Sequence, residues 1–183
     1  MAGKFYGQDL KEAHALAIGK IVMAWNEYQD QLGQIFAALF GARNWALALA
    51  AWNALENDRA QRSMLVEVTK AKMKVDSKAY KEIKWMVDIT NDMIADQRNT
   101  GIHMPLMSYT DLKGVHQILP LAMFGNRRVT KMVGRDLLRE YAHYEAQIRK
   151  MYGFAVAIDF KLSPRRKGRA NWPTRPQLSG KKR

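Results

Sequence analysis

Apolar residues recur at alternating spacings of four and three residues along the first part of the chain. The stripe comprises His14, Ile18, Ile21, Trp25, Tyr28, Leu32, Ile35 and Leu39. This spacing puts these side chains on one face of a helix. Asp9 suits the N-cap position and Gly41 suits a helix end. The pattern therefore predicts one long helix from Asp9 to about Gly41.

Three further regions have a helical period. The second covers about residues 44–74 and is expected to bend or break at residues 57–58, where an alanine-rich stretch gives way to charged residues. A third helix is expected over about residues 77–99, starting at a serine that suits the N-cap. The period returns over about residues 134–155. These elements predict an all-α fold, a bundle of four helices with one elaborated loop between the third and the fourth.

Residues 104–133 interrupt the helical pattern. The segment contains Pro105 and Pro120 and shows no sustained helical period. Its part from Val115 to Phe124 fits either a short hairpin or a helical turn, and periodicity does not choose between them. We therefore expect a long irregular insertion before the last helix of the bundle.

Positive charge is concentrated at the carboxyl end of the chain. The chain of 183 residues carries 30 Lys and Arg against 17 Asp and Glu, a formal charge of +13. Residues 163–183 include eight basic residues and no acid. The prolines, glycines and low hydrophobicity of this stretch argue against independent folding. The sequence therefore predicts a helical bundle domain over residues 1–162 and a flexible, disordered basic tail over residues 163–183.

A basic arm of this kind binds polyanions by releasing counterions, so RNA or DNA is the expected partner. A tryptophan in the arm can stack on an exposed base. A second basic run lies inside the domain. The expected RNA-binding residues are Lys70, Lys72, Lys74, Arg165, Arg166, Lys167, Arg169 and Trp172. The alternatives are a solubilising end for the tail and a solvated helix face for the lysines.

Several classes of protein are excluded by what the chain lacks. It has no cysteine, which excludes a disulfide scaffold and thiolate chemistry. The acid pairs among Asp88, Asp92 and Asp96 have no histidine in register, so we expect neither a metal site nor a cofactor. The uncharged apolar stretch over residues 44–55 is too short to cross a bilayer, and the amino terminus lacks an apolar signal core. We therefore expect a cytoplasmic protein without a membrane span.

One stretch near the end of the third helix is a candidate for catalysis. Arg98 and His103 lie five residues apart, and in an unbroken helix their side chains would point about 140° from each other. Gly101 and Pro105 favour an end to the helix here, which would let His103 turn toward Arg98. A guanidinium can hold a phosphate, and a histidine can move a proton to or from a ribose hydroxyl. The pair therefore suits metal-independent cleavage of a phosphodiester, whereas the alternative is an ordinary arginine and histidine at a helix end.

The stretch Arg98-Asn99-Thr100-Gly101-Ile102-His103 resembles the Arg, polar, several residues, His signature of HEPN domains. These are small bundles of four to five helices, and many of them are ribonucleases. The order of the helices around the motif is also similar, over about residues 9–160. The resemblance implies that the arginine and the histidine are the catalytic pair and that Asn99 orients them. It also makes Glu27 on the first helix a candidate additional polar residue, for which a surface ion pair is the favoured alternative.

By the same resemblance, the protein is expected to be a HEPN-like endoribonuclease that acts on RNA as a homodimer, without a metal, and leaves a cyclic phosphate. Such proteins recur as toxins or phage-defence effectors, often beside a nucleotidyltransferase-like antitoxin. Other members have lost catalysis, so the alternative is an inactive helical module that binds RNA, nucleotides or protein. A third interpretation is a purely structural bundle in which the tryptophans and methionines are core material.

Overall fold

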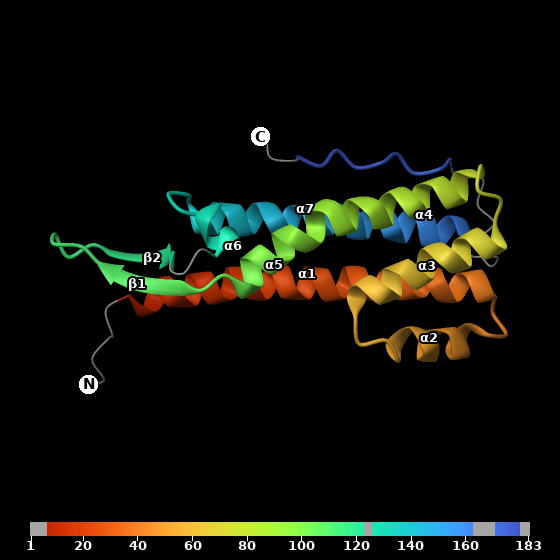
Figure 1. The fold of residues 1–183 in the computed structure, drawn as a ribbon, viewed down its shortest axis with the longest axis horizontal. Helices are drawn as coiled ribbons and strands as arrows, with labels where there is room; N and C mark the ends of the chain where they lie inside the picture. The colour runs from red at the N-terminus through yellow and green to blue at the C-terminus, as the bar shows by residue number, and fades with distance from the viewer. Residues whose placement is uncertain (1–6, 123–125, 163–170, 180–183) are drawn as a thin grey trace.

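The computed structural model describes residues 7–122, 126–162 and 171–179. It is predominantly helical, with a small two-stranded sheet at one end (Figure 1). The elements are, in chain order, α1 (Gln8–Phe40), α2 (Trp45–Asn53), α3 (Asp58–Lys72), α4 (Lys78–Ile89), the π-helical turn η1 (Thr90–Ile94), α5 (Ala95–His103), β1 (Leu106–Thr110), β2 (His116–Pro120), α6 (Arg127–Thr130) and α7 (Leu137–Leu162). The predicted long first helix, the break near residues 57–58 and the last helix are confirmed. Within the described ranges, no helix combines the length and apolar character needed to cross a bilayer.

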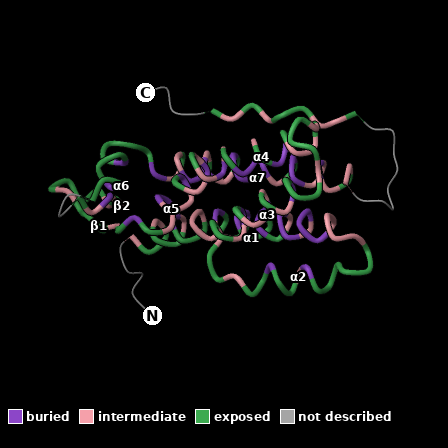
Figure 2. Tube along the Cα trace, turned by 45° about the vertical axis from the view of Figure 1, so that its right-hand side comes forward, coloured by how far each residue is buried: buried purple, intermediate pink, exposed green. Residues whose placement is uncertain are grey.

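The two longest helices, α1 and α7, run side by side in the same direction at the centre of the bundle (Figure 1). Near one end, the ring of His14 packs edge-on against Tyr141, and toward the other, Gln31 Nε2 donates to Asp159 Oδ2 at 3.2 Å. Buried positions are concentrated where α1, α4 and α7 face one another, whereas α2 is largely exposed (Figure 2). His14 is thus a buried histidine at the core, as its place on the apolar stripe predicted.

The helix expected over residues 77–99 is longer than predicted and contains a π-helical turn. α4, η1 and α5 follow one another without a break and end at His103. Thr90, the first residue of η1, donates its hydroxyl to Met86 O and accepts from Tyr28 Oη, both at 2.7 Å. A threonine hydroxyl bonded to the preceding turn perturbs the regular helical ladder. The widened turn changes the direction in which the α5 side chains point.

The expected end of this helix at Gly101 is wrong. Gly101 lies inside α5, which continues for two further residues. A Cβ built on Gly101 would lie 2.9 Å from Cδ1 of Ile21, a buried residue of α1. The missing side chain therefore allows α5 and α1 to approach closely, and it does not break the helix.

Residues 104–133 are more regular than the expected irregular insertion. β1 and β2 form an antiparallel hairpin, and the short helix α6 follows it. Asp111 closes the hairpin loop, because its Oδ1 accepts from the backbone N–H groups of residues 113 and 115. Gly114 completes the loop in the left-handed conformation, at φ 78°. These local turn signals decide the structure of the segment, and a search for helical periods does not detect them.

The C-terminal segment over residues 171–179 lies along α4 and α7 (Figure 1). Arg175 Nε forms a salt bridge with Oε2 of the buried Glu82 at 2.7 Å, and its guanidinium lies 4.9 Å from the ring centroid of Trp85. Burial raises the pKa of the Glu82 carboxyl, but hydrogen bonds from Arg175 and Lys78 outweigh this effect and hold the pKa below its usual value. The sequence predicted a flexible tail over residues 163–183; within it, this segment contacts the bundle through an arginine that bonds to a buried carboxylate.

Candidate functional site

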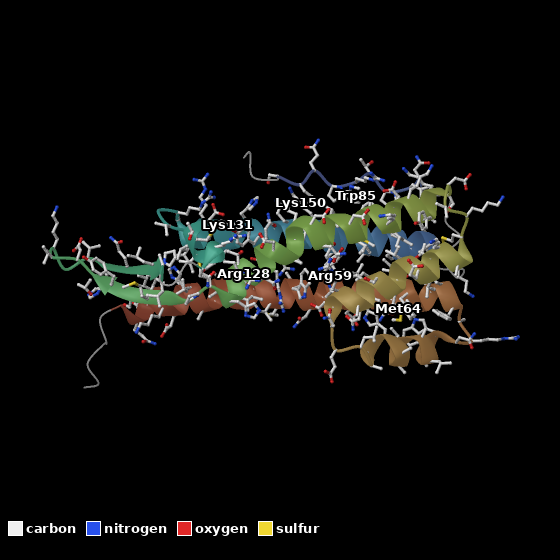
Figure 3. All side chains as sticks on the ribbon, viewed as in Figure 1. Arg59, Met64, Trp85, Arg128, Lys131 and Lys150 are labelled. Carbon is white, nitrogen blue, oxygen red and sulfur yellow. The ribbon has the colours of Figure 1, made fainter. Side chains whose placement is uncertain are left out.

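A cavity of about 530 Å³ opens where α1, α3, η1 and α5 meet. Its walls include Trp25 from α1, the first turn of α3, Asn91 from η1, and Arg98 and Asn99 from α5. Arg59, which is exposed at the start of α3, also borders the cavity and is labelled in Figure 3. Two residues of the motif that the sequence singled out therefore line one cavity.

Trp25 contacts several of the residues that line this cavity. The side chain is buried, and its indole Nε1 donates to Asp58 Oδ2 at 2.9 Å. The guanidinium carbons of Arg62 and Arg98 lie 5.4 and 5.5 Å from the ring centroid of Trp25. Both arginines therefore make cation–π contacts with the same indole, which holds two positive groups from different helices close together.

Arg62 is a buried guanidinium with an unused donor. Only 3% of the residue is exposed, and its Nε donates to Asn91 Oδ1 at 2.9 Å. Its Nη1 is buried without a hydrogen-bond partner, and no carboxylate in the described part of the chain lies within salt-bridge distance of it. Burial lowers the pKa of this guanidinium, and the nearby charge of Asp58 partly offsets the effect. A buried cation with incomplete hydrogen bonds is costly, which favours an anionic ligand at this position.

Arg98 shows the same incomplete pattern of hydrogen bonds. Its Nη1 donates to Asn99 Oδ1 at 2.8 Å, whereas its Nε is buried without a partner. Asn99 thus fixes the orientation of the Arg98 guanidinium at the cavity wall. Arg98 therefore brings a second guanidinium group to the wall of this cavity, beside Arg62.

The acidic groups around the cavity leave these two donors available. Asp58 Oδ2 accepts from Trp25, and Asp96 forms a salt bridge with Lys131 at 3.3 Å. Glu56 is exposed. Anions with several acceptor oxygens, such as phosphate groups, match the forked geometry of guanidinium groups. The cavity lining thus places guanidinium groups of this kind beside acidic groups that are bonded elsewhere or exposed.

His103 does not converge with Arg98 within one chain. It is exposed at the last position of α5 and does not line the cavity. Because α5 is unbroken between the two residues, their side chains point about 140° apart. Asn99 and His103 are four residues apart and share a helix face. The predicted turn of His103 toward Arg98 is therefore wrong, because the glycine between them serves helix packing instead.

Other residues expected at the site lie away from the cavity. Glu27 is exposed on α1 and forms a salt bridge with Arg149 of α7 at 3.4 Å, which matches the alternative of a surface ion pair. The three candidate lysines lie at or just beyond the end of α3 that is far from the cavity; these are Lys70, Lys72 and Lys74. The structure thus separates them from the two motif residues at the cavity.

The candidates in the C-terminal region divide into two groups. Trp172 packs against the outside of the hydrophobic core, with Lys161 Nζ 6.0 Å from its ring centroid, so its ring is engaged within the molecule. The basic candidates Arg165, Arg166, Lys167 and Arg169 lie outside the described residues.

Arg62 and Asn91 belong to the site, but the sequence analysis did not identify them. A signal for Arg62 is present in the spacing of Arg62, Leu65 and Thr69, which are the buried residues of α3. An arginine on the buried stripe of a helix is unusual, because a fully buried charge needs a partner. No sequence pattern marks Asn91 as a site residue, because its position beside Arg62 depends on the π-helical turn η1.

No group of three or more His, Asp or Glu side chains in the described ranges is arranged to hold a metal ion. Comparison with protein-family models, with curated proteins and with solved structures finds no match for this chain.

Proposed function

We propose that the protein binds RNA and that the cavity between α1, α3 and α5 holds a phosphate group of the RNA chain. One observation carries the proposal: two buried guanidinium nitrogens, Arg62 Nη1 and Arg98 Nε, lack partners and belong to side chains of one cavity. A phosphate supplies acceptor oxygens to both nitrogens. The negative charge of the phosphate also offsets the positive charges of the two arginines, which lie close to the Trp25 ring.

RNA is the phosphate source that the rest of the chain favours. The formal charge of +13 suits a polyanion, and the motif that contributes Arg98 and Asn99 resembles that of HEPN ribonucleases. In this proposal Asn99 orients one guanidinium, Asn91 orients the other, and the Trp25 ring keeps them together.

Fluorescence anisotropy with a labelled single-stranded RNA of mixed sequence tests the proposal. Arg98→Gln removes a charged hydrogen-bond donor from the cavity, so it should weaken binding by about ten-fold or more. Arg139→Gln is the matched control, because it removes one positive charge from an exposed residue of α7 that does not line the cavity. The control should weaken binding by less than about three-fold. Equal losses in the two variants would contradict a phosphate seated at Arg98.

A second candidate function is a HEPN-like endoribonuclease, acting as a toxin or phage-defence effector. It is favoured by the position of His103, which is exposed at the end of α5 one turn beyond Asn99 and thus accessible to a second copy of the chain. Because Arg98 and His103 of one chain diverge, this function requires a homodimer in which the two motifs face each other. A nucleotidyltransferase-like antitoxin is the protein partner that this candidate implies.

The chemistry of this candidate needs no metal. An imidazole accepts the proton of a ribose 2′-hydroxyl, the 2′-oxygen attacks the phosphorus, and the bond to the 5′-oxygen breaks as that oxygen gains a proton from the second imidazole. The Arg98 guanidinium stabilises the charge that develops on the phosphate. The products are a 2′,3′-cyclic phosphate and a 5′-hydroxyl end.

Incubation of RNA with the protein in EDTA, followed by mass spectrometry of the product ends, tests this second candidate. His103→Ala should abolish cleavage without changing RNA affinity, and His143→Ala on α7 should cleave like the unmodified protein. RNA left intact by the unmodified protein, or cleavage that survives His103→Ala, would exclude the candidate and leave the binding proposal standing.

A further inference from the structure

A second cavity, of about 280 Å³, borders the phosphate cavity. We propose that this second cavity binds a nucleobase of the RNA and that Gln29 reads the edge of that base. The inference rests on the proposed RNA-binding function, because it assigns the base that accompanies the bound phosphate.

The two cavities share part of their walls. Trp25, Asp58 and Arg98 line both of them. A nucleotide whose phosphate contacts Arg98 can therefore place its nucleoside in the second cavity. Trp25 and Trp52 also line the second cavity, but both are buried and their rings already pack on other side chains. The group of this cavity that can select a base is therefore Gln29.

Gln29 is the residue that most needs a ligand in this cavity. Only 8% of it is exposed, and both of its amide atoms, Nε2 and Oε1, are buried without a hydrogen-bond partner in the described part of the chain. An amide that leaves both a donor and an acceptor unpaired destabilises the fold, since these groups give up their bonds to water. It lies on the buried side of α1 between Tyr28 and Leu32, where an apolar residue would pack without this cost.

The other polar groups of the second cavity distinguish a base from a second anion. Arg98 is the single cation among its lining residues, whereas Asp30 and Asp58 are both acidic. Gln61, which also lines it, uses its Nε2 to donate to the backbone carbonyls of Trp52 and Leu55, so that group is already engaged. A neutral ligand with a donor next to an acceptor matches the free amide of Gln29, and adenine presents that pair at N6 and N7.

The stability of Gln29→Met tests whether the amide has a structural role. Methionine has a similar shape and lacks the unpaired polar atoms, so the melting temperature should be unchanged or higher. Gln31→Met is the matched control on the same helix, because Gln31 donates to Asp159 and its replacement should lower the melting temperature. A marked decrease for Gln29→Met would show that its amide supports the fold, and this result would overturn the inference.

Binding of RNA homopolymers of equal length, in adenine, uracil and cytosine forms, tests the reading of the base. The unmodified protein should prefer the adenine form by about five-fold or more, and Gln29→Met should reduce this preference to less than about two-fold. Competition by inorganic phosphate should be the same for both proteins. A preference that survives Gln29→Met, or no preference in the unmodified protein, would overturn the inference and indicate a cavity that holds water only.

The outcomes separate this inference from the proposed function. If only the base-reading inference fails, Arg98→Gln still weakens RNA binding more than Arg139→Gln does. If the phosphate proposal fails, that difference disappears whatever the effect of Gln29→Met.

Discussion

At the scale of single residues, two buried tyrosines of the core differ in whether their hydroxyls are bonded. Tyr28 Oη donates to Thr90 Oγ1 at 2.7 Å, and the Thr90 hydroxyl in turn donates a hydrogen bond to Met86 O. Tyr141 Oη is buried without a partner. Burial raises the pKa of both hydroxyls, that of Tyr141 to about 12. A bonded hydroxyl stabilises the fold, whereas an unbonded one in the same core does not.

Replacing each tyrosine by phenylalanine should therefore change stability in opposite ways. Tyr28→Phe should lower the free energy of unfolding by about 1 kcal/mol, because it removes a satisfied hydrogen bond. Tyr141→Phe should leave it unchanged or raise it by up to about 1 kcal/mol, because it removes an unsatisfied group. Urea denaturation followed by circular dichroism measures both. A larger loss for Tyr141→Phe than for Tyr28→Phe would mean that the hydrogen bonding described for this core is incorrect.

At the scale of elements, glycines let helices approach one another. A Cβ built on Gly33 of α1 would lie 2.9 Å from Nε1 of Trp52, a buried residue of α2 that also packs on Phe36. Gly19, on the same helix, has no heavy atom within 4 Å of such a Cβ. The position of α2 therefore depends on the missing side chain at Gly33.

Alanine substitutions at these two glycines should have opposite effects. Gly33→Ala should destabilise the protein by about 1–2 kcal/mol, because the rigid indole cannot yield without moving α2. Gly19→Ala should stabilise it by about 0.5–1 kcal/mol, the usual gain of alanine over glycine in a helix. Thermal unfolding of the two variants measures the difference. Gain of stability in both would show that α2 does not pack tightly on α1.

The sequence predicts those elements that have local, periodic signals. It does not predict features that depend on a contact between residues far apart in the chain. The apolar stripe from His14 to Leu39 was sufficient to predict α1. The meaning of Gly101 depends on its distance from Ile21, which no local pattern reveals. The hairpin depends on one aspartate and one left-handed glycine, which a search for helical periods does not weigh.

The candidate site shows the same limit. Arg98 and Asn99 were found because they belong to a motif in consecutive positions. Arg62 and Gln29 come from two other helices, and they become site residues only when the bundle brings α3 and α1 to the same cavities. These residues could not be grouped with Arg98 from the sequence, because they are far from it in the chain.

At the scale of the whole molecule, the C-terminal segment acts as a strap across the outside of the bundle. Arg175 bonds to Glu82 and covers Trp85, and Lys150 Nζ donates to Gln177 O at 3.0 Å (Figure 3 labels Trp85 and Lys150). Part of the positive charge of the tail is thus used within the protein. The formal net charge of +13 already counts Glu82, so the ion pair leaves that value unchanged.

Arg175→Gln should release this strap. The substitution removes the salt bridge to Glu82, and residues 171–179 should then move on the picosecond to nanosecond timescale. The heteronuclear NOE of their backbone amides, measured by NMR, should fall to values typical of a flexible chain. Arg139→Gln, an exposed charge change on α7, should leave these NOE values unchanged. Unchanged values in Arg175→Gln would show that other contacts are sufficient to hold the segment.

In the proposed function, Arg62 and Arg98 hold the same phosphate of a bound RNA. A double-mutant cycle in RNA affinity, with Arg62→Gln, Arg98→Gln and the double variant, tests it most directly. Two groups that share one phosphate are coupled, so the double variant should bind better than the sum of the single losses predicts, with a coupling of about 1 kcal/mol or more. Single losses that simply add, or variants that bind RNA as well as the unmodified protein, would contradict the claim.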